Sequence, residues 1–309
     1  MVGLGRMGGN MSQRLRQGGH EVVGYDRDPA TSDVADLPAL VAALGEGPRA
    51  VWVMVPSGAP TDGAIDELHG LLAPGDVVVD GGNSNFRDSI RHGEQLAEDG
   101  IGFVDAGVSG GIWGLQEGYA LMVGGAAEHV SLLAPALATL APGASGFAHV
   151  GGVGAGHFTK MVHNGIEYGL MQAYAEGYEL LTASELQVDA DAALRSWQHG
   201  SVVRSWLLDL LVLGLEQDPG LVGIRGYASD SGEGRWTVNE AVRLAVPLPV
   251  ISAALFARFA SRQEDSPAMK VVAALRNQFG GHSTEAADRR PAESMTGAAV
   301  GEAGKVQPS

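Results

Sequence analysis

The chain lacks cysteine and long apolar runs, and each absence excludes a class of protein. With no cysteine among 309 residues, no disulfide can form, so a secreted, disulfide-stabilised protein is not expected. No run of about 18 uncharged apolar residues is present, so no segment is suited to span a membrane. The N-terminus also lacks the basic and apolar segments of a secretory signal. We therefore expect a cytoplasmic protein with no membrane partner.

Positive charge is also scarce. The sequence has 20 Lys and Arg against 36 Asp and Glu, a formal net charge of −16. Nucleic-acid binding needs a basic surface that displaces counterions, so no nucleic-acid partner is expected. An anionic ligand would need a locally basic pocket. The length is about twice that of a typical domain, which indicates two domains.

The first half of the chain alternates short β-branched runs with amphipathic segments, a pattern typical of βαβ units. The runs occupy Glu21–Tyr25, Ala50–Val55, Asp76–Asp80, Gly102–Asp105 and Ala120–Val123, and the helical segments include Met7–Gln17, Ala64–Leu72 and Ser89–Glu98. This pattern predicts an α/β fold with a doubly wound, parallel, Rossmann-like sheet over residues 1–150.

Strand signals end at the glycine-rich stretch Gly151–Gly156, and helical patterns run from His157 to about Phe279. We therefore expect an all-α domain over residues 151–282. Residues 283–309 have almost no large apolar side chain, so burial cannot offset their ordering entropy, and a disordered tail is predicted.

The first strand is unusually short in this pattern, because only Met1 and Val2 precede the glycine motif. Strands usually have about five or six residues. Either the natural start lies upstream or this strand is truncated. The burial of a central strand favours the upstream start.

A dinucleotide site is indicated by Gly3-Leu4-Gly5-Arg6-Met7-Gly8, which matches G-x-G-x-x-G. The motif alone is weak, but a helix follows it, and Asp26 ends the next predicted strand 18 residues after Gly8. A carboxylate there would accept hydrogen bonds from free ribose hydroxyls and repel a 2′-phosphate, so NAD is preferred to NADP. Arg27 keeps NADP as an alternative cofactor, since its guanidinium could pair with the 2′-phosphate.

Three later strand ends carry polar and glycine residues: Val55-Pro56-Ser57, Asp80-Gly81-Gly82-Asn83-Ser84 and Val108-Ser109-Gly110-Gly111. In an open parallel sheet such ends meet at the carboxyl edge, where ligands bind. The alternative is that these residues only form turns and bind no ligand, because Gly, Ser and Asn are common loop residues.

The segment from Gly156 to Tyr168 places four polar residues on one helical stripe, at i, i+3, i+4 and i+7. They are Lys160, His163, Asn164 and Glu167. We expect this stripe to face a cleft, with Met161, Val162 and Ile166 turned toward packing. The alternative is that these four residues lie on a solvent-exposed face of the helix and pair with one another there. A metal held by His163 and Glu167 would lack an evident third ligand, so no metal is expected.

The motifs Gly3–Gly8, Asp80–Ser84, Val108–Gly111 and Lys160–Tyr168 together resemble the 6-phosphogluconate dehydrogenase family. Gly232–Thr237 and Leu275–His282 extend the resemblance, and the lack of a repeated helical half makes the chain similar to the short form. The resemblance implies oxidative decarboxylation of 6-phosphogluconate to ribulose 5-phosphate with NAD. It implies Lys160 as general base and then acid, and Glu167 as the acid that protonates the enediol.

The remaining site residues follow from motif and resemblance together. Cofactor contacts are expected from Gly3, Leu4, Gly5, Arg6, Met7, Gly8, Asp26, Val55, Pro56 and Asn83. Substrate contacts are expected from Asn83, Ser109, Gly110, Gly111, His163, Asn164 and Tyr168.

A phosphorylated sugar acid also needs convergent cations, and Arg276 with His282 could supply them. In the family a similar pair comes from the neighbouring subunit, which implies a homodimer or homotetramer with shared active sites. Arg262 is a further candidate. Longer members carry lysine and threonine where this chain has Ser231 and Glu233, which puts those two phosphate contacts in doubt.

Two other functions stay open. A 3-hydroxyacid dehydrogenase would share the glycine loop, the Ser-Gly-Gly segment and the catalytic lysine, but it would not need Glu167 or the pair of Arg276 and His282. A nucleotide-binding protein without catalysis is the second alternative.

Overall fold

The computed structural model describes residues 1–143 and 145–285. The chain divides into two compact units, Met1–Arg262 and Gln263–Ser309, which we describe separately. Among the described residues, no helix is long and apolar enough to cross a membrane. The predicted tail lies outside the described residues from position 286 onward.

The first unit is built on a five-stranded sheet in the order β1-β2-β3-β4-β5. Its strands are β1 (Ala50–Val53), β2 (Val77–Asp80), β3 (Gly102–Ser109), β4 (Ala120–Gly125) and β5 (Phe147–Gly151). β1, β2 and β3 are parallel, and so are β4 and β5, but β4 runs antiparallel to β3. The predicted parallel sheet is therefore confirmed as the dominant arrangement, with one antiparallel pair at β3 and β4. The link over residues 110–119 is shorter than the crossover of about a dozen residues that a parallel pair needs.

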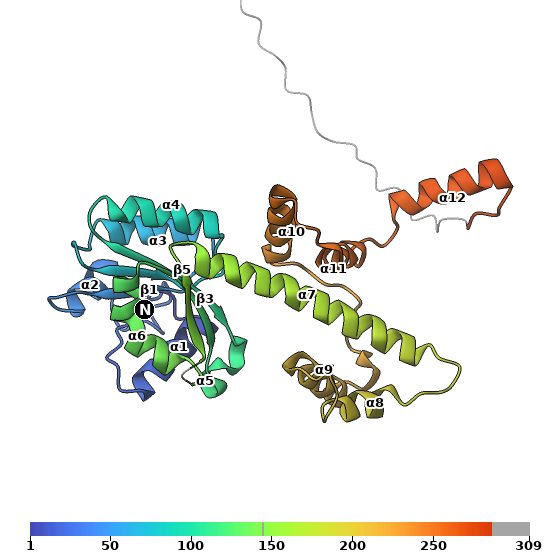
Figure 1. Ribbon diagram of the computed structural model, residues 1–309, viewed down its shortest axis with the longest axis horizontal. Coiled ribbons are helices and arrows are strands. Elements are labelled where there is room, and N and C mark those ends of the chain that lie inside the picture. Colours follow the sequence, from blue (N-terminus) through green and yellow to red (C-terminus); the bar gives the residue numbers. More distant parts are fainter. Residues whose placement is uncertain (144, 286–309) are drawn as a thin grey trace, which may run out of the picture. The chain divides into compact units, whose positions relative to one another are not determined.

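Helices cover both faces of this sheet (Figure 1). On one face lie α1 (Arg6–Gln17) and α6 (Ala127–Leu140), and on the other lie α2 (Leu37–Ala43), α3 (Ala59–His69) and α4 (Phe86–Ala97). Val79 packs in one core with Met11 of α1 and Leu137 of α6, whereas Val78 packs in the other with Leu68 of α3. Neighbouring residues of a strand point to opposite faces, which explains the continuous valine run in β2. The short elements η1 (Gly111–Trp113) and α5 (Gly114–Glu117) link β3 to β4.

Two strands predicted near the N-terminus are reduced to isolated bridges, and one edge strand was not predicted. The segment Glu21–Tyr25 is not a strand, and only Tyr25 forms a bridge, to Val2. Val2 is buried and also bridges Val53, so a single residue stands where the first strand was expected. β5 was not predicted, because this edge strand is mostly exposed and has no alternating apolar pattern.

The rest of the first unit is helical, as predicted. Helix α7 (Ala155–Thr182) is 28 residues long and carries a helix pair on each of two sides (Figure 1). α8 (Ala190–Trp197) and α9 (Trp206–Gln217) pack with Tyr174 and Tyr178 of α7, and η2 (Pro219–Leu221) follows them. α10 (Glu233–Leu244) and α11 (Pro249–Ala260) pack with Tyr168 and Met171. The α/β fold with a helical second half is confirmed.

The second unit is described over residues 263–285 and contains α12 (Pro267–Gly280). The Ser266 side chain caps the start of this helix by accepting a hydrogen bond from the Met269 amide at 3.5 Å. Arg276 and His282 belong to this unit. The predicted boundary near residue 150 lies inside the first unit, at the change from sheet to helix, and stays a prediction.

Candidate active site

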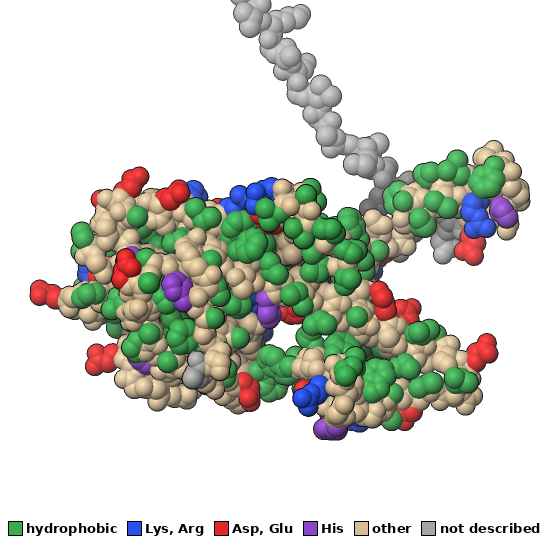
Figure 2. Space-filling view, viewed as in Figure 1, with side chains coloured by type: hydrophobic (Ala, Val, Ile, Leu, Met, Phe, Trp, Pro, Cys, Tyr) green, Lys and Arg blue, Asp and Glu red, His purple; other side chains and the backbone are tan. Residues whose placement is uncertain are grey.

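A cavity of about 1610 Å³ opens between the carboxyl edge of the sheet and the helices α7 and α9. Figure 2 shows a hollow between the part of the chain that carries the sheet and the α8 and α9 pair. The cavity brings together sixteen predicted site residues: Gly3, Gly5, Arg6, Met7, Gly8, Asp26, Val55, Pro56, Asn83, Ser109, Gly110, Gly111, Lys160, His163, Asn164 and Glu167. Leu4, Tyr168 and Arg262 belong to the same unit but do not line it.

The glycine loop forms one end of the cavity. Gly3 has a φ of +88°, a left-handed conformation that favours glycine. A Cβ at Gly8 would lie 2.0 Å from the Gly3 carbonyl oxygen, so no larger residue fits between the loop and α1. α1 then begins at Arg6 with no acidic residue in its first turn. This helix start is therefore suited to bind a pyrophosphate through free N–H groups.

Asp26 lies at the same end of the cavity, where the ribose of a dinucleotide is expected. Its carboxylate accepts hydrogen bonds from the Leu4 amide at 2.6 Å and from the Asp28 amide at 2.9 Å. These backbone donors, Asp28 first, hold the pKa of Asp26 below its usual value, so the group is charged near neutral pH. Leu4 contributes its amide to this arrangement, while its side chain packs against the core. Arg27 also lines this end.

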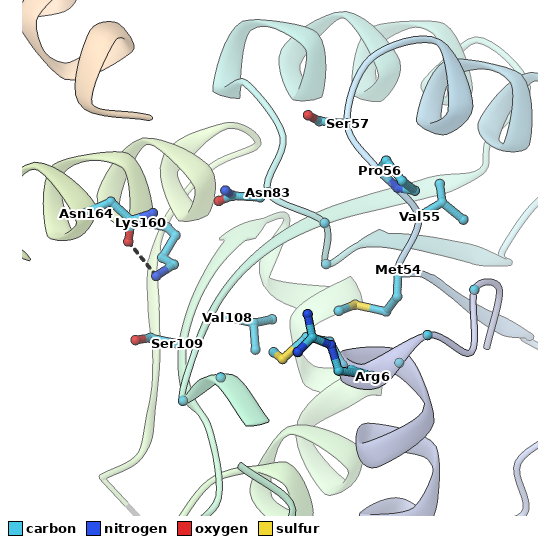
Figure 3. Close-up of a pocket in the computed structure, with 18 of the residues that line it drawn as sticks. Arg6, Met54, Val55, Pro56, Ser57, Asn83, Val108, Ser109, Lys160 and Asn164 are labelled. Carbon is cyan, nitrogen blue, oxygen red and sulfur yellow. Dashed lines mark hydrogen bonds between the residues drawn. The ribbon is translucent and has the colours of Figure 1, made fainter. Parts of the chain in front are cut away.

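The polar stripe of α7 forms the other end, and Figure 3 shows two of its side chains, Lys160 and Asn164, joined by a hydrogen bond. Lys160 Nζ donates to Asn164 Oδ1 at 2.6 Å, and His163 Nδ1 lies 3.2 Å from the same oxygen. An amide oxygen only accepts, so Nδ1 donates its hydrogen to Asn164, and the other ring nitrogen, Nε2, lies 3.5 Å from Ser109 Oγ. Glu167 Oε2 lies 3.8 Å from His163 Nδ1. The prediction that these four side chains of α7 share one face toward a cleft is confirmed by the cavity lining.

The electrostatic state of Lys160 suits a proton acceptor. Burial lowers the pKa of its amine, although the carboxylates of Glu167 and Glu233 oppose this shift. A lowered pKa increases the fraction of neutral amine at a given pH. The neutral amine is the form that can take a proton from a hydroxyl group.

The packing predicted for the same helix is only partly right. Met161 is buried, as expected, but Val162 and Ile166 line the cavity, and Ile166 is 52% exposed. The helix α9, whose sequence carried no functional signal, supplies the facing wall. The apolar residues that this wall adds to the cavity are Trp206, Leu207 and Leu210.

Tyr168 lies behind the stripe rather than in the cavity. It is 5% exposed, and the Arg258 guanidinium stacks on its ring with the carbon 3.5 Å from the centroid. Arg262, the arginine chosen from the sequence, is instead ion-paired with Asp230 at 2.9 Å. The sequence reasoning missed Arg258. The two arginines lie one helical turn apart in sequence, so spacing alone could not tell which one faces Tyr168.

The side chains of Ser231 and Glu233 form a hydrogen bond with each other. Ser231 Oγ donates to Glu233 Oε2 at 2.6 Å, and the Ser231 amide donates to the Tyr168 hydroxyl at 3.3 Å. Glu233 is 1% exposed, and its other carboxylate oxygen has no hydrogen-bond partner among the described residues. The Ser231 hydroxyl is therefore occupied within the chain. Arg276 and His282 lie in the second unit, so their place at this site stays a prediction.

Comparisons with known proteins now decide the family. A family model described as the NAD binding domain of 6-phosphogluconate dehydrogenase matches residues 1–151, and one described as the 6-phosphogluconate dehydrogenase C-terminal domain matches residues 156–298. The chain belongs to the 6-phosphogluconate dehydrogenase family. The predicted resemblance is thereby confirmed.

The relatives of this 6-phosphogluconate dehydrogenase family member include long and short chains. The NAD(+)-dependent, decarboxylating 6-phosphogluconate dehydrogenase of Haloferax volcanii is 39% identical over 298 residues, which cover 93% of this chain and 98% of that protein. The 6-phosphogluconate dehydrogenase structure of Plasmodium falciparum is similar with a TM-score of 0.77 at 25% identity, covering 95% of this chain and 66% of that one. A 3-hydroxyisobutyrate dehydrogenase of Mycobacterium tuberculosis shares the fold, with a TM-score of 0.67 at 23% identity over 89% of this chain and 97% of that one.

Proposed function

We propose that this protein oxidises and decarboxylates 6-phosphogluconate to ribulose 5-phosphate and carbon dioxide, with NAD as the hydride acceptor. One observation carries the proposal. A single cavity has a dinucleotide loop with Asp26 at one end and the stripe of Lys160, His163, Asn164 and Glu167 at the other. The named activity of the Haloferax volcanii relative supports the same reading.

The cofactor end fits a dinucleotide without a 2′-phosphate. The loop from Gly3 to Gly8 and the start of α1 would hold the pyrophosphate, and Asp26 would accept from the ribose hydroxyls. NAD, when bound, takes the hydride from the alcohol carbon of the substrate. A charged Asp26 disfavours NADP at this position because two negative charges would repel each other.

Lys160 serves two proton transfers in this mechanism. Its neutral amine takes the proton of the substrate hydroxyl as the hydride leaves the same carbon, which produces a ketone β to the carboxylate. The lysine then returns that proton to the ketone oxygen while the bond to carbon dioxide breaks. The electron pair of that bond forms the enediol. The amine ends the sequence neutral, as it began.

Glu167 completes the reaction by protonating the enediol on carbon. It lies two turns beyond Lys160 on the same stripe and lines the cavity, so one substrate could meet both groups. A dehydrogenase without decarboxylation would have no enediol and no need of this second acid. The hydroxyl proton of the enediol passes to water as the product ketone forms, and the Glu167 carboxylate recovers a proton from water, so the step releases no net proton.

The substrate phosphate needs cations beyond the stripe. We propose Arg258 as one, because its guanidinium stacks on the predicted substrate residue Tyr168 and donates to the Ser229 carbonyl oxygen at 3.0 Å, whereas Arg262 is ion-paired with Asp230. Arg276 and His282 would come from a neighbouring subunit, which makes the protein a homodimer or homotetramer with shared sites. A cytoplasmic location stays the prediction made from the sequence.

The test is cofactor reduction by the full-length protein, followed by the absorbance of reduced nicotinamide. 6-Phosphogluconate with NAD should be turned over faster than with NADP, and carbon dioxide should form in step with reduced cofactor. The comparison substrate is 3-hydroxyisobutyrate, after which the Mycobacterium tuberculosis enzyme of similar fold is named. Faster turnover of 3-hydroxyisobutyrate would favour the hydroxyacid dehydrogenase, and reduction with neither substrate would favour a nucleotide-binding protein.

A further inference from the structure

One face of β3 meets the start of α7 at three successive points. Asp105, Gly107 and Ser109 alternate along the strand and so point to the same side of the sheet. Each contacts a different part of the first turns of α7. Ser109 is a predicted substrate residue, but neither Asp105 nor Gly107 has a place in the mechanism so far.

Asp105 binds the first turn of the helix with both carboxylate oxygens. It is fully buried, and it accepts hydrogen bonds from the amides of Gly154 and His157, each at 2.7 Å. These amides belong to the end of a 28-residue helix whose N-terminus carries partial positive charge. An asparagine could accept only one of the two bonds, because its second position is a donor.

Gly107 sets how closely the helix approaches the strand. A Cβ placed there would lie 2.5 Å from the Cβ of Lys160 and 2.9 Å from the carbonyl oxygen of Gly156. The second contact is with backbone, so a side chain at position 107 would push the helix itself away from the sheet. The absence of a side chain therefore allows Lys160 to lie directly over β3.

We propose that Asp105 and Gly107 are positioning residues that hold Lys160 at its working place and keep its amine away from water. This inference rests on the proposed role of Lys160 as the base. The carboxylate anchors the helix end, and the glycine lets the lysine stem lie against the strand. Loosening either contact would move the amine and admit water around it. A displacement of about 1 Å at a catalytic group can cost roughly 100-fold in rate.

The experiment compares two variants with two matched controls, all in the full chain. Asp105→Asn keeps the shape of the side chain but removes one hydrogen-bond acceptor. Gly107→Ala keeps Asp105 but places a methyl group in the space where α7 packs closely on β3. Asp76→Asn changes another buried aspartate, which binds the amides of Ala73 and Arg49 away from the cavity. Gly177→Ala adds a methyl group to α7 where the structure leaves open space.

Two readouts separate positioning from simple stability. The first is kcat with 6-phosphogluconate and NAD, beside NADH affinity and melting temperature. The second is the pKa of the Lys160 amine, measured as the pH dependence of its reaction with trinitrobenzenesulfonate by peptide mass spectrometry. The sequence has three lysines, Lys160, Lys270 and Lys305, so the modified peptides are easy to assign. The amine readout does not need turnover, so it still tests the positioning if the proposed activity fails.

We expect both test variants to lose about 10- to 100-fold in kcat with NADH affinity nearly unchanged, and the Lys160 pKa to rise toward that of an ordinary lysine. Both controls should stay within about threefold in kcat with the same lysine pKa, even if Asp76→Asn melts earlier. The proposal is overturned if the test variants keep the wild-type lysine pKa. It is also overturned if both fail to fold while Asp76→Asn folds, because the two residues would then serve the fold itself.

Discussion

Lys160 Nζ donates a 2.6 Å hydrogen bond to Asn164 Oδ1 across one turn of α7. The same amide oxygen faces His163 Nδ1, so a single acceptor orients the lysine and the histidine together. This shared contact holds the amine at the cavity wall while burial lowers its pKa. The amine is therefore both fixed in place and prepared to accept a proton.

Replacing Lys160 with methionine should lower turnover by about two to four orders of magnitude, the usual scale for losing a positioned acid or base. It should also stabilise the fold, most strongly at low pH. The folded state lowers the pKa of this lysine, so folding is penalised at every pH below that lowered pKa, and the penalty fades as the pH rises from the lowered pKa toward the ordinary pKa of lysine. Melting temperatures across a pH series and kcat check both effects.

The control for this change is Lys270→Met, since Lys270 is an exposed lysine of α12 paired with Asp265. It should leave turnover nearly unchanged. A stabilisation by Lys160→Met that is equal at all pH values would contradict the lowered pKa. Turnover within tenfold of normal would contradict the catalytic role.

Changing Glu167 to glutamine should keep the shape of the site but remove the acid that protonates the enediol. Overall turnover should fall by roughly two to four orders of magnitude. In a single turnover, cofactor reduction should be less impaired than release of ribulose 5-phosphate, because Lys160 still accepts the hydroxyl proton. Glu176→Gln on the same helix, an exposed partner of Gln172, is the control. Near-normal turnover in Glu167→Gln would instead support a hydroxyacid dehydrogenase.

Replacing Asp26 with serine should weaken the preference for NAD over NADP by roughly 10- to 100-fold in the ratio of kcat/KM values, about 1.4 kcal/mol for each factor of ten. The cause is loss of a carboxylate that its backbone donors keep charged. Asp28→Ser is the matched control, because Asp28 bonds to the Ala30 amide and does not line the cavity. A wild-type protein that already uses NADP better would refute the role given to Asp26.

Arg258→Met should raise the KM for 6-phosphogluconate by roughly 10- to 100-fold, since a hydrogen bond to a charged group contributes about 1.5 to 3 kcal/mol. NAD affinity should hardly change. Arg262→Met should act differently and mainly lower the melting temperature, because Asp230 would lose one of its two arginine partners. Steady-state kinetics and thermal melts on both variants test the assignment. The reverse pattern would restore Arg262 as the phosphate contact.

A shared active site predicts complementation between two defective subunits. Lys160→Ala and Arg276→Met should each be nearly inactive alone, because every site lacks one group. In mixed dimers one of the two sites would be intact, so random mixing should restore roughly a quarter of wild-type activity. Mixing subunits under dissociating conditions and assaying after reassociation makes the measurement. No recovery, with mixed dimers present by mass spectrometry, would show that each site is built from one chain.

Several elements were predictable because local pattern and tertiary packing agree. The valine run of β2 is buried on both faces, as a continuous apolar run indicates. The helical spacing of Lys160, His163, Asn164 and Glu167 was enough to place them on one side of α7. By contrast, β5 is an exposed edge strand, and its sequence carries no period-2 signal.

The sequence by itself determined the residue types of the chemistry and their order on each element, because helical and strand periodicities depend only on spacing along the chain. It therefore indicated the glycine loop, Asp26 and the stripe of α7. Only the tertiary structure decided which distant side chains meet. It placed Arg258 rather than Arg262 against Tyr168, and Asp105 beneath the start of α7. Such contacts depend on how whole elements pack, which no local pattern encodes.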